Sequence, residues 1–482
     1  MGRSLLAVAV VAAVVLSGCA FLDVGGIAEP DSNRPDPDAD VLGWEDGYWW
    51  NDSVAVDASD GLSKAELEVV TARMMARIER IRGHEFTEDV RVRVISHDEY
   101  RSGGSDDPEG TPTEEQFWEA TFVVGEDDGV AESFDALYGS AVQGYYSNGR
   151  IVVIGSGDGG DLRISRATLV HELEHALQDQ QLTLRVNAST RDGTLAGRGI
   201  TEGDANYVES LYEARCEDGR FDCVSVPDGD GEGNTDGGGE RLAYNRGLFV
   251  STFVPYAEGA EFVAALRERG GWAAVDDGFE TQPASTEQVI HPDAYPDERP
   301  ERVTVRDRSN APWNRVGDGE VVGEATAYAA LWYNDVVPRD HLTSTEDGRY
   351  TYDHPITAGW GGDRLVAYEN DGQHGYVWKT TWDSTGDARE FATAYRDLLE
   401  SKDATARGDG VYVIEDGAFA DAFRVVRTDE TVVVVNAPTV GALDGVRDRE
   451  QQGARAPTVG ALDGAHDRHQ RTANASVAGG VP

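Results

Sequence analysis

The sequence predicts an α+β fold in which a mostly helical half is accompanied by a small β-sheet. Three observations lead to this fold class. Several segments repeat apolar residues at intervals of three and four, as amphipathic helices do. Other segments alternate apolar and polar residues or concentrate β-branched and aromatic ones, as strands do. A regular alternation of strands with helices, which is typical of parallel α/β proteins, is missing.

Helices are predicted from this periodicity and from capping residues. Ser165 is a candidate N-cap for the helix that contains the sequence HELEH, and Ser384 and Thr385 lie before another predicted helix. The predicted helical segments are 63–83, a helix beginning after Ser165, 202–216, two stretches around Pro255 within 245–272, 323–334 and 387–400.

Strands are predicted in two regions. Residues 89–96 alternate, and residues 142–155 form a predicted hairpin around Ser147-Asn148-Gly149. Further along, the strand-like segments are 377–382, 410–416 and a hairpin over 424–435. The folded core is therefore predicted to end near Val435.

The composition indicates a folded protein adapted to high salt. Among 482 residues the formal net charge is -46, and Lys64, Lys379 and Lys402 are the only lysines. At molar salt the Debye length is about 3 Å, so like charges repel weakly. A disordered acidic chain is the alternative, but 40% of the residues are hydrophobic. Nucleic acid is excluded as a partner because the chain has no basic surface to neutralise phosphates.

The N-terminus has the pattern of an exported lipoprotein. After Arg3, a short apolar stretch ends in LSGC, so residues 1–18 are predicted to be a signal peptide and Cys19 the lipidated residue. A plain signal peptide with a coincidental cysteine is the alternative. Residues 19–45, rich in Pro and Asp, are predicted to be a tether. The protein is therefore expected on the extracellular face of the cell membrane, held there by its lipid anchor.

One large domain is predicted between this tether and a disordered tail. It spans residues 46–435 and contains an acidic, Gly-rich insertion at 228–240, which we interpret as a solvated loop. The tail, residues 436–482, holds a duplication: the segment that begins at Ala437 recurs from Ala456, a period of 19 residues. Two short polar copies cannot stack into a solenoid core, so we interpret them as part of the disordered tail.

Two cysteines lie close together after the helix predicted at 202–216. In an extracellular setting, Cys216 and Cys223 favour a disulfide. A metal site is the weaker alternative, because no second pair of cysteines and no nearby histidine completes it.

The segment HELEH, residues 171–175, is the strongest functional signal. On a helix, His171 and His175 lie one turn apart on one face, so both imidazoles can reach one metal ion. Glu172 follows the first histidine and lies beside the same ion, where its carboxylate can take a proton from water and pass it to a leaving amine. The alternative is a chance pattern in a chain rich in glutamate.

Two histidines alone rarely hold catalytic zinc, so a third ligand is needed. Glu202, at the start of the next predicted helix, is the candidate, since an antiparallel helix pair would return it to the metal. The alternative is an acid that stabilises the N-terminus of its own helix, beside Thr201 and Asp204.

Together, HELEHALQDQQ and the following TEGDA resemble the gluzincin zinc peptidases. The chain is still more similar to predicted secreted metallopeptidases found among haloarchaeal cell-surface lipoproteins, and this resemblance covers roughly residues 63–435. It implies a zincin-like core in which Zn²⁺ is bound by His171, His175 and Glu202, with Glu172 as the general base.

The chain departs from this pattern in its supporting residues. Thermolysin-like gluzincins usually place an aspartate four residues after the ligating glutamate, whereas this chain has Asn206. Asp204 and Asp179 are the candidates to orient the histidines instead. For stabilising the oxyanion, His291 is the first candidate and Tyr295 the second; an ordinary surface histidine is the alternative for His291.

The sequence thus predicts a lipid-anchored, extracellular zinc hydrolase that acts on polypeptides. The first alternative is a catalytically inactive zincin-like surface protein with a binding or structural role. A solute-binding lipoprotein ranks last, because the chain lacks a periodic βαβ pattern.

Overall fold

The computed structural model describes residues 35–96, 99–100, 110–141, 144–147, 149–154, 164–224, 244–345 and 348–449. The predicted signal peptide, Cys19, the insertion at 228–240 and the second copy of the duplication lie outside the described residues. Within them the chain is a mixture of helices and sheets, which confirms the α+β class. Among the described helices, none has the length and apolar character needed to cross a membrane.

Each predicted helix is present at about its predicted position, and the described residues contain four further helices. The described helices are α1 (Lys64–Arg82), α3 (Pro112–Ala120), α4 (Val130–Ala141), α5 (Arg166–Gln181), α6 (Arg191–Glu217), α7 (Arg246–Ala257), α8 (Gly259–Glu280), α9 (Thr286–Ile290), α10 (Gly323–Tyr333), α11 (Thr385–Ser401) and α12 (Leu443–Val446). The four further helices are α3, α4, α9 and α12. Ser165 caps α5 by accepting a hydrogen bond from the Thr168 backbone, as predicted.

A three-stranded sheet lies next to the helices of the N-terminal half. Its order is β3 (Arg91–Ile95), β5 (Arg150–Ile154), β4 (Gly144–Ser147), and the antiparallel pairing of β4 with β5 confirms the predicted hairpin. β3 pairs with β5 in parallel. β4 therefore forms one edge of this sheet, and it contacts α5.

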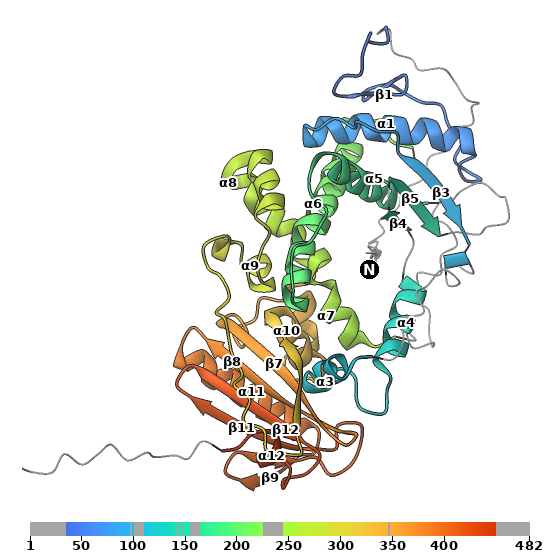
Figure 1. The fold of residues 1–482 in the computed structure, drawn as a ribbon. Helices are drawn as coiled ribbons and strands as arrows, with labels where there is room; N and C mark the ends of the chain where they lie inside the picture. Colours follow the sequence, from blue (N-terminus) through green and yellow to red (C-terminus); the bar gives the residue numbers. More distant parts are fainter. Residues whose placement is uncertain are drawn as a thin grey trace, which may run out of the picture. The chain divides into compact units, whose positions relative to one another are not determined.

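Helices α1, α5 and α6 contact one another in pairs, and Figure 1 shows them grouped beside the three-stranded sheet. α6 begins at Arg191 rather than near Glu202, so the prediction placed its start too late. Gly193, Gly197 and Gly199 lower the helix propensity of the missed part. Glu202 consequently lies in the middle of a long helix, and the interpretation of Glu202 as an N-terminal capping acid is wrong.

A further glycine of α6, Gly203, allows close packing against α8. A Cβ on Gly203 would lie 2.2 Å from the backbone oxygen of Gly259, and a Cβ on Gly259 would lie 2.6 Å from the Gly199 oxygen. The two helix backbones therefore touch where no side chain fits between them. Gly203 directly follows Glu202, so this contact fixes the position of the Glu202 backbone along α8.

The C-terminal part of the chain forms a seven-stranded antiparallel sheet of order β6-β7-β8-β12-β11-β10-β9. Its strands are β6 (Asn314–Glu320), β7 (Trp360–Asn370), β8 (Gln373–Trp382), β9 (Thr405–Gly408), β10 (Val411–Val413), β11 (Ala422–Thr428) and β12 (Thr431–Ala437). The sequence pattern identified β8, β10, β11 and β12. It missed β6, β7 and β9, so this sheet is larger than the one predicted from sequence.

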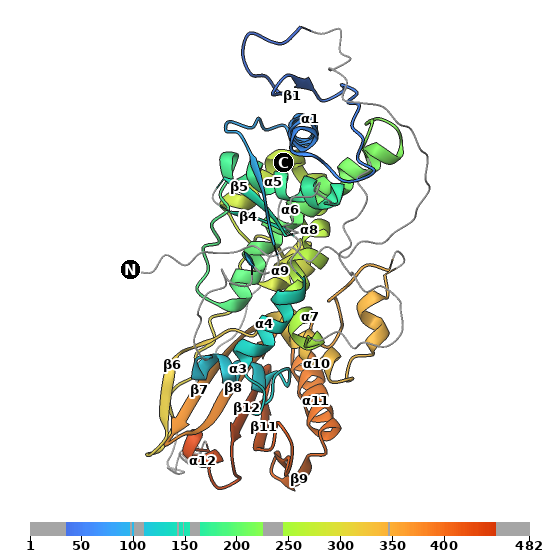
Figure 2. The ribbon, with the colours of Figure 1, turned by 90° about the vertical axis from the view of Figure 1, so that its right-hand side faces the viewer.

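Alternate residues of this sheet enter two different cores. Trp378 and Val434 pack with α11, α10 and α3 in the largest hydrophobic cluster, whereas Val377 and Val435 pack with α12 in another. Because neighbouring residues of a strand point to opposite faces, α11 and α12 cover opposite faces of the sheet. Figure 2 shows α11 lying along the strands.

The folded domain extends beyond both of its predicted boundaries. β12 continues to Ala437, and the buried residues Leu443 and Val446 hold α12 against the sheet. Asp444 forms an ion pair with the buried Arg424. Residues 437–449, which begin the first copy of the duplication, therefore belong to the folded part of the chain and not to the predicted tail. At the other end, β1 (Trp44–Glu45) pairs with β2 (Tyr48–Trp49) and contacts α1, so the predicted tether ends before residue 44.

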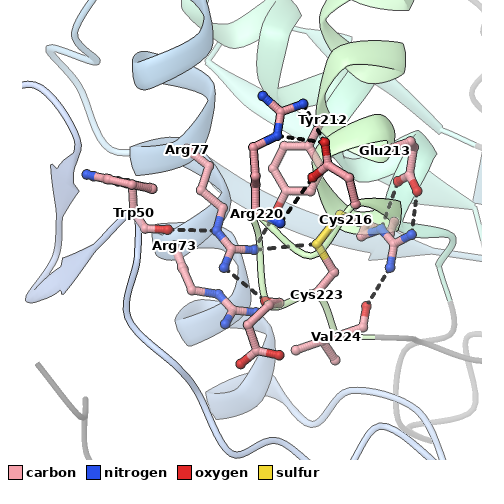
Figure 3. Close-up of a disulfide and its surroundings, with 12 residues drawn as sticks. Trp50, Arg73, Arg77, Tyr212, Glu213, Cys216, Arg220, Cys223 and Val224 are labelled. Atoms are coloured by element: carbon pink, nitrogen blue, oxygen red, sulfur yellow. Dashed lines mark hydrogen bonds and ion pairs between the residues drawn. A yellow bond between two sulfur atoms is a disulfide. The ribbon is translucent and has the colours of Figure 1, made fainter. Parts of the chain in front are cut away.

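A disulfide joins Cys216, in the last turn of α6, to Cys223, with the Cα atoms 5.6 Å apart. Figure 3 shows Arg77 of α1 directed at this region. Its guanidinium donates to the Tyr212 hydroxyl at 3.1 Å and to the Trp50 backbone oxygen at 2.8 Å. The end of α6 is thereby attached to α1.

Replacing Gly203 with alanine should lower the free energy of unfolding by about 1–3 kcal/mol, because the new methyl group would overlap the Gly259 backbone. Denaturant unfolding in molar KCl measures this change. Gly441→Ala is the control, since only the Thr439 hydroxyl, at 4.0 Å, lies near its added Cβ. An unfolding midpoint of Gly203→Ala equal to that of the parent would show that the two helices do not depend on this contact.

Candidate metal centre

Helices α5 and α6 bring His171, His175 and Glu202 together. One oxygen of Glu202, Oε2, lies 3.4 Å from Nε2 of His171 and 3.3 Å from Nε2 of His175. All three side chains are 2% exposed or less. One ligand atom from each residue lies within 4.8 Å of the others, so the three residues can hold a metal ion. Among the groups of this kind in the described residues, this one alone contains histidine.

The two imidazoles and the carboxylate perturb one another strongly. Burial lowers the pKa of His171, but hydrogen bonds to Glu202 and Glu209 outweigh this effect and raise the pKa to about 10. Burial raises the pKa of Glu202, but the charge of His175 and hydrogen bonds to both histidines bring the pKa down to about 2. Glu202 therefore stays ionised, and it gives the centre a buried negative charge that attracts cations.

Glu172 lies beside these three residues and is completely buried. Burial raises its pKa to about 7, although the positive charges of His175 and His171 act in the opposite direction. Its two carboxylate oxygens are shut off from bulk water. β4 passes close to it, since a Cβ on Gly144 would lie 4.0 Å from Glu172 Cγ. A carboxyl group with such a pKa can both accept and release a proton near neutrality.

His175 is oriented by a residue that the sequence pattern did not single out. Nδ1 of His175 lies 2.9 Å from Gln178 Oε1, which leaves Nε2 directed at the centre. The amide of Gln178 in turn donates to the Thr201 backbone oxygen at 3.0 Å and to Asp204 Oδ2 at 3.1 Å. Asp204, a predicted supporting residue, therefore acts on His175 only through Gln178.

His171 has a different partner. Its Nδ1 lies 3.4 Å from Oε2 of Glu209, which follows Glu202 by two helical turns on the same face of α6. Asn206, which occupies the position of the usual aspartate, instead donates to the Tyr256 backbone oxygen at 3.1 Å. Asp179, the other predicted supporting residue, accepts a hydrogen bond of 2.7 Å from the Tyr146 hydroxyl. The spacing of Glu202 and Glu209 was the one signal in the sequence for this arrangement.

Behind the histidines, a buried ionic network joins four helices. Arg82 of α1 lies 3.1 Å from Asp204 of α6, 2.7 Å from Asp276 of α8 and 3.6 Å from Glu174 of α5. The Arg82, Asp204 and Glu174 side chains are fully shielded from water. Because an unpaired charge is costly at such a depth, the network fixes the relative positions of these helices.

Tyr256, near the end of α7, is a further residue of the centre that the sequence pattern did not reveal. Its side chain is only partly exposed and forms a hydrogen bond with Glu202. Burial raises its pKa well above the usual value, and the charge of Glu202 adds to this effect. The hydroxyl therefore keeps its proton. The predicted helical stretches around Pro255 contained Tyr256, but nothing in their spacing linked it to HELEH.

His291, the first candidate for stabilising the oxyanion, directly follows α9 and contacts an acid that is not one of the candidate ligands. Its Nε2 lies 3.1 Å from Oε1 of the buried Glu324. Burial lowers the pKa of His291, but the hydrogen bond to Glu324 and the charge of Glu324 outweigh this effect and raise the pKa to about 9. Among the described contacts of His291, none reaches the three candidate ligands. Tyr295, the second candidate, donates to the Thr281 backbone oxygen at 2.6 Å. A catalytic role for either residue stays a prediction.

Removing the carboxylate that supports His171 should weaken metal binding. Glu209→Ala is expected to lower zinc affinity about 10- to 100-fold, the usual cost of losing a hydrogen-bonded partner of a ligating histidine. Competition with a chelating dye measures the affinity, and Glu209→Gln should restore part of it because the amide oxygen can still accept the Nδ1 proton. The matched control is Glu217→Ala, an exposed acid on the same helix. Equal affinities of Glu209→Ala and Glu217→Ala would show that Glu209 does not support His171.

Comparison with known protein families finds a match in the C-terminal part of the chain. A family model described as a domain of unknown function (DUF8575) matches residues 314–447. This range runs from β6 through α12 and so corresponds to the seven-stranded sheet with its covering helices. A search of curated proteins found none that matches. The helices that carry His171, His175 and Glu202 lie outside the matched family.

Proposed function

We propose that the protein is a zinc-dependent hydrolase of polypeptides with a zincin-like core, bound by a lipid anchor to the extracellular face of the cell membrane. The observation that carries this proposal is the spacing of the three candidate ligands. In tetrahedral zinc sites with bonds of about 2.0–2.1 Å, ligand atoms are separated by about 3.3–3.4 Å. Glu202 Oε2 lies at 3.4 and 3.3 Å from the two Nε2 atoms.

The kinds of ligand support zinc as the ion. Two imidazole nitrogens and one carboxylate form the ligand set of several catalytic zinc sites, in which a fourth position is left for water or substrate. Nε2 of His175 is buried and lies 3.3 Å from Oε2 of Glu202, so both atoms face the position that a metal ion would take. When bound, zinc would act as a Lewis acid that polarises a carbonyl group and makes a nearby water more acidic.

The protein side chains then supply proton transfer and orientation. Glu172, with its pKa near 7, takes the proton of the attacking water and delivers it to the leaving amine nitrogen. Tyr256 keeps its proton and donates it in a hydrogen bond to Glu202, which helps to orient the ligating carboxylate. Gln178 and Glu209 hold the two imidazoles in the orientation that ligation requires.

A polypeptide substrate is supported by the position of β4. Among the described strands, β4 pairs with β5 alone, and it passes beside Glu172. The free edge of such a strand can form backbone hydrogen bonds with an extended peptide. A peptide bound there would place its backbone next to the general base.

Other features support a location outside the cell. The disulfide between Cys216 and Cys223 suits an oxidising compartment. The signal and lipidation pattern ending at Cys19 lies outside the described residues, and it supports the membrane anchor through sequence alone. The net charge of -46 supports operation at high salt and argues against nucleic acid as a partner.

The first test of this proposal is metal content. The purified protein should contain about one zinc ion per chain, and His171→Ala should reduce this to less than a tenth, because two ligands rarely retain zinc. Elemental analysis after dialysis in molar KCl measures the content. His374→Ala, in β8, is the control for loss of a histidine. The proposal would be contradicted if the parent protein contained no zinc and chelators left its thermal unfolding temperature unchanged.

The second test separates an enzyme from an inactive protein of the same fold. Glu172→Gln should retain zinc but reduce peptide turnover by about 10²- to 10⁴-fold, because the amide cannot accept the proton. Hydrolysis of unstructured casein in molar KCl measures turnover, with Glu390→Gln on the exposed face of α11 as the control. A zinc-containing parent protein that hydrolyses no peptide would instead favour a binding role at the cell surface.

A further inference from the structure

An arginine beside the metal centre lacks a partner within the described residues. Arg198 lies on α6, one helical turn before Glu202. Its Nε atom is shut off from water and has no hydrogen-bond acceptor. No ion pair or hydrogen bond of its guanidinium is found in the described part of the chain, and its side chain is only partly exposed.

Carboxylate partners are available to arginines in this part of the protein. The chain has 88 acidic and 42 basic residues, so carboxylates are plentiful. Several partly or fully buried arginines around the same helices have a carboxylate partner: Arg82 binds Asp204, Arg166 binds Glu213 and Arg191 binds Glu114. Because a buried nitrogen donor without an acceptor is costly, the Nε atom of Arg198 would gain from an acceptor that a ligand supplies.

The position of Arg198 places it at the wall of the metal centre. Residues four apart on a helix lie on the same face, so Arg198 and Glu202 project to the same side of α6. Tyr256 lies near both residues: it forms a hydrogen bond with Glu202, and the charge of Arg198 lowers its pKa. One turn further toward the N-terminus, Leu195 belongs to the hydrophobic cluster formed by α3, α4 and α7.

We propose that Arg198 binds a carboxylate of the substrate and so makes the enzyme selective for peptides that carry a negative charge near the cleaved bond. A guanidinium binds a carboxylate through two parallel hydrogen bonds, which an amide or hydroxyl of the substrate cannot reproduce. The carboxylate is either the C-terminal one or that of an Asp or Glu side chain. This inference rests on the proposed peptidase function.

Binding to an inactive but metal-loaded protein tests the inference without relying on turnover. Three peptides are used: acetyl-Ala-Phe-Ala-Phe-Ala with a free C-terminus, the same peptide as its C-terminal amide, and the amide with one internal alanine replaced by glutamate. Their dissociation constants are measured by calorimetry in molar KCl for Glu172→Gln and for Glu172→Gln combined with Arg198→Gln. The charge-matched control combines Glu172→Gln with Arg389→Gln, an exposed arginine of α11.

The Glu172→Gln protein should bind at least one of the charged peptides about 10- to 100-fold more tightly than the neutral amide, as a charge-assisted hydrogen bond implies. Preference for the first peptide identifies the C-terminal carboxylate, and preference for the third identifies an acidic side chain. Arg198→Gln should abolish the preference and Arg198→Lys should retain part of it, with zinc content unchanged in both, whereas Arg389→Gln should preserve it.

Equal binding of all three peptides, or an equal loss for all three on Arg198→Gln, would overturn the inference and assign Arg198 a structural role. Should Arg198→Gln lose zinc, Arg198→Lys decides the question: a preference equal to that of the parent overturns the inference, and a reduced one supports it. Hydrolysis of casein without any carboxylate preference would contradict the inference and leave the proposed function intact. Charge-selective binding by a parent protein without turnover would contradict the proposed function alone.

Discussion

The placement of a buried carboxylate between two imidazoles is the interaction on which the candidate centre depends. Glu202 comes from α6 and the histidines come from α5, so the contact also joins two helices. Moving a carboxylate out of water costs several kcal/mol, which a single hydrogen bond would not offset. The two imidazoles together offset this cost, and they keep Glu202 ionised. The arrangement stores negative charge at a point that only a cation or protonated histidines can neutralise.

This contact requires that α5 and α6 stay at a fixed distance and level. On one side, the Gly203 and Gly259 backbones touch, so α6 can neither approach α8 further nor admit a side chain between them. On the other side, Arg82 connects α1 to Asp204, next to the ligand, and to Glu174, next to His175. Close packing and ionic pairing therefore act on the same turn of α6. A centre supported in this way is organised before a metal ion binds, which would lower the free-energy cost of binding that ion.

The seven-stranded sheet follows the helices of the candidate metal centre in the chain and does not supply its ligands. It carries the match to the family of unknown function, whereas the candidate ligands come from helices that precede it in the chain. The two regions share buried residues, since Leu195 of α6 and Trp378 of β8 belong to one hydrophobic cluster. A function assigned to the matched family would therefore describe the sheet region, and the centre on α5 and α6 has to be judged from its own geometry.

The sequence by itself determined what depends on near neighbours in the chain. The four-residue spacing of His171 and His175, the Ser165 cap and the close pair Cys216 and Cys223 are all local features. The tertiary structure alone decided the rest: the partners Glu209 and Tyr256, the correct start of α6, and the folding of α12 against the sheet. These depend on contacts between distant segments. Glycines that look unfavourable for a helix become favourable when another backbone packs against them, and a short polar segment folds when a sheet buries its few apolar residues.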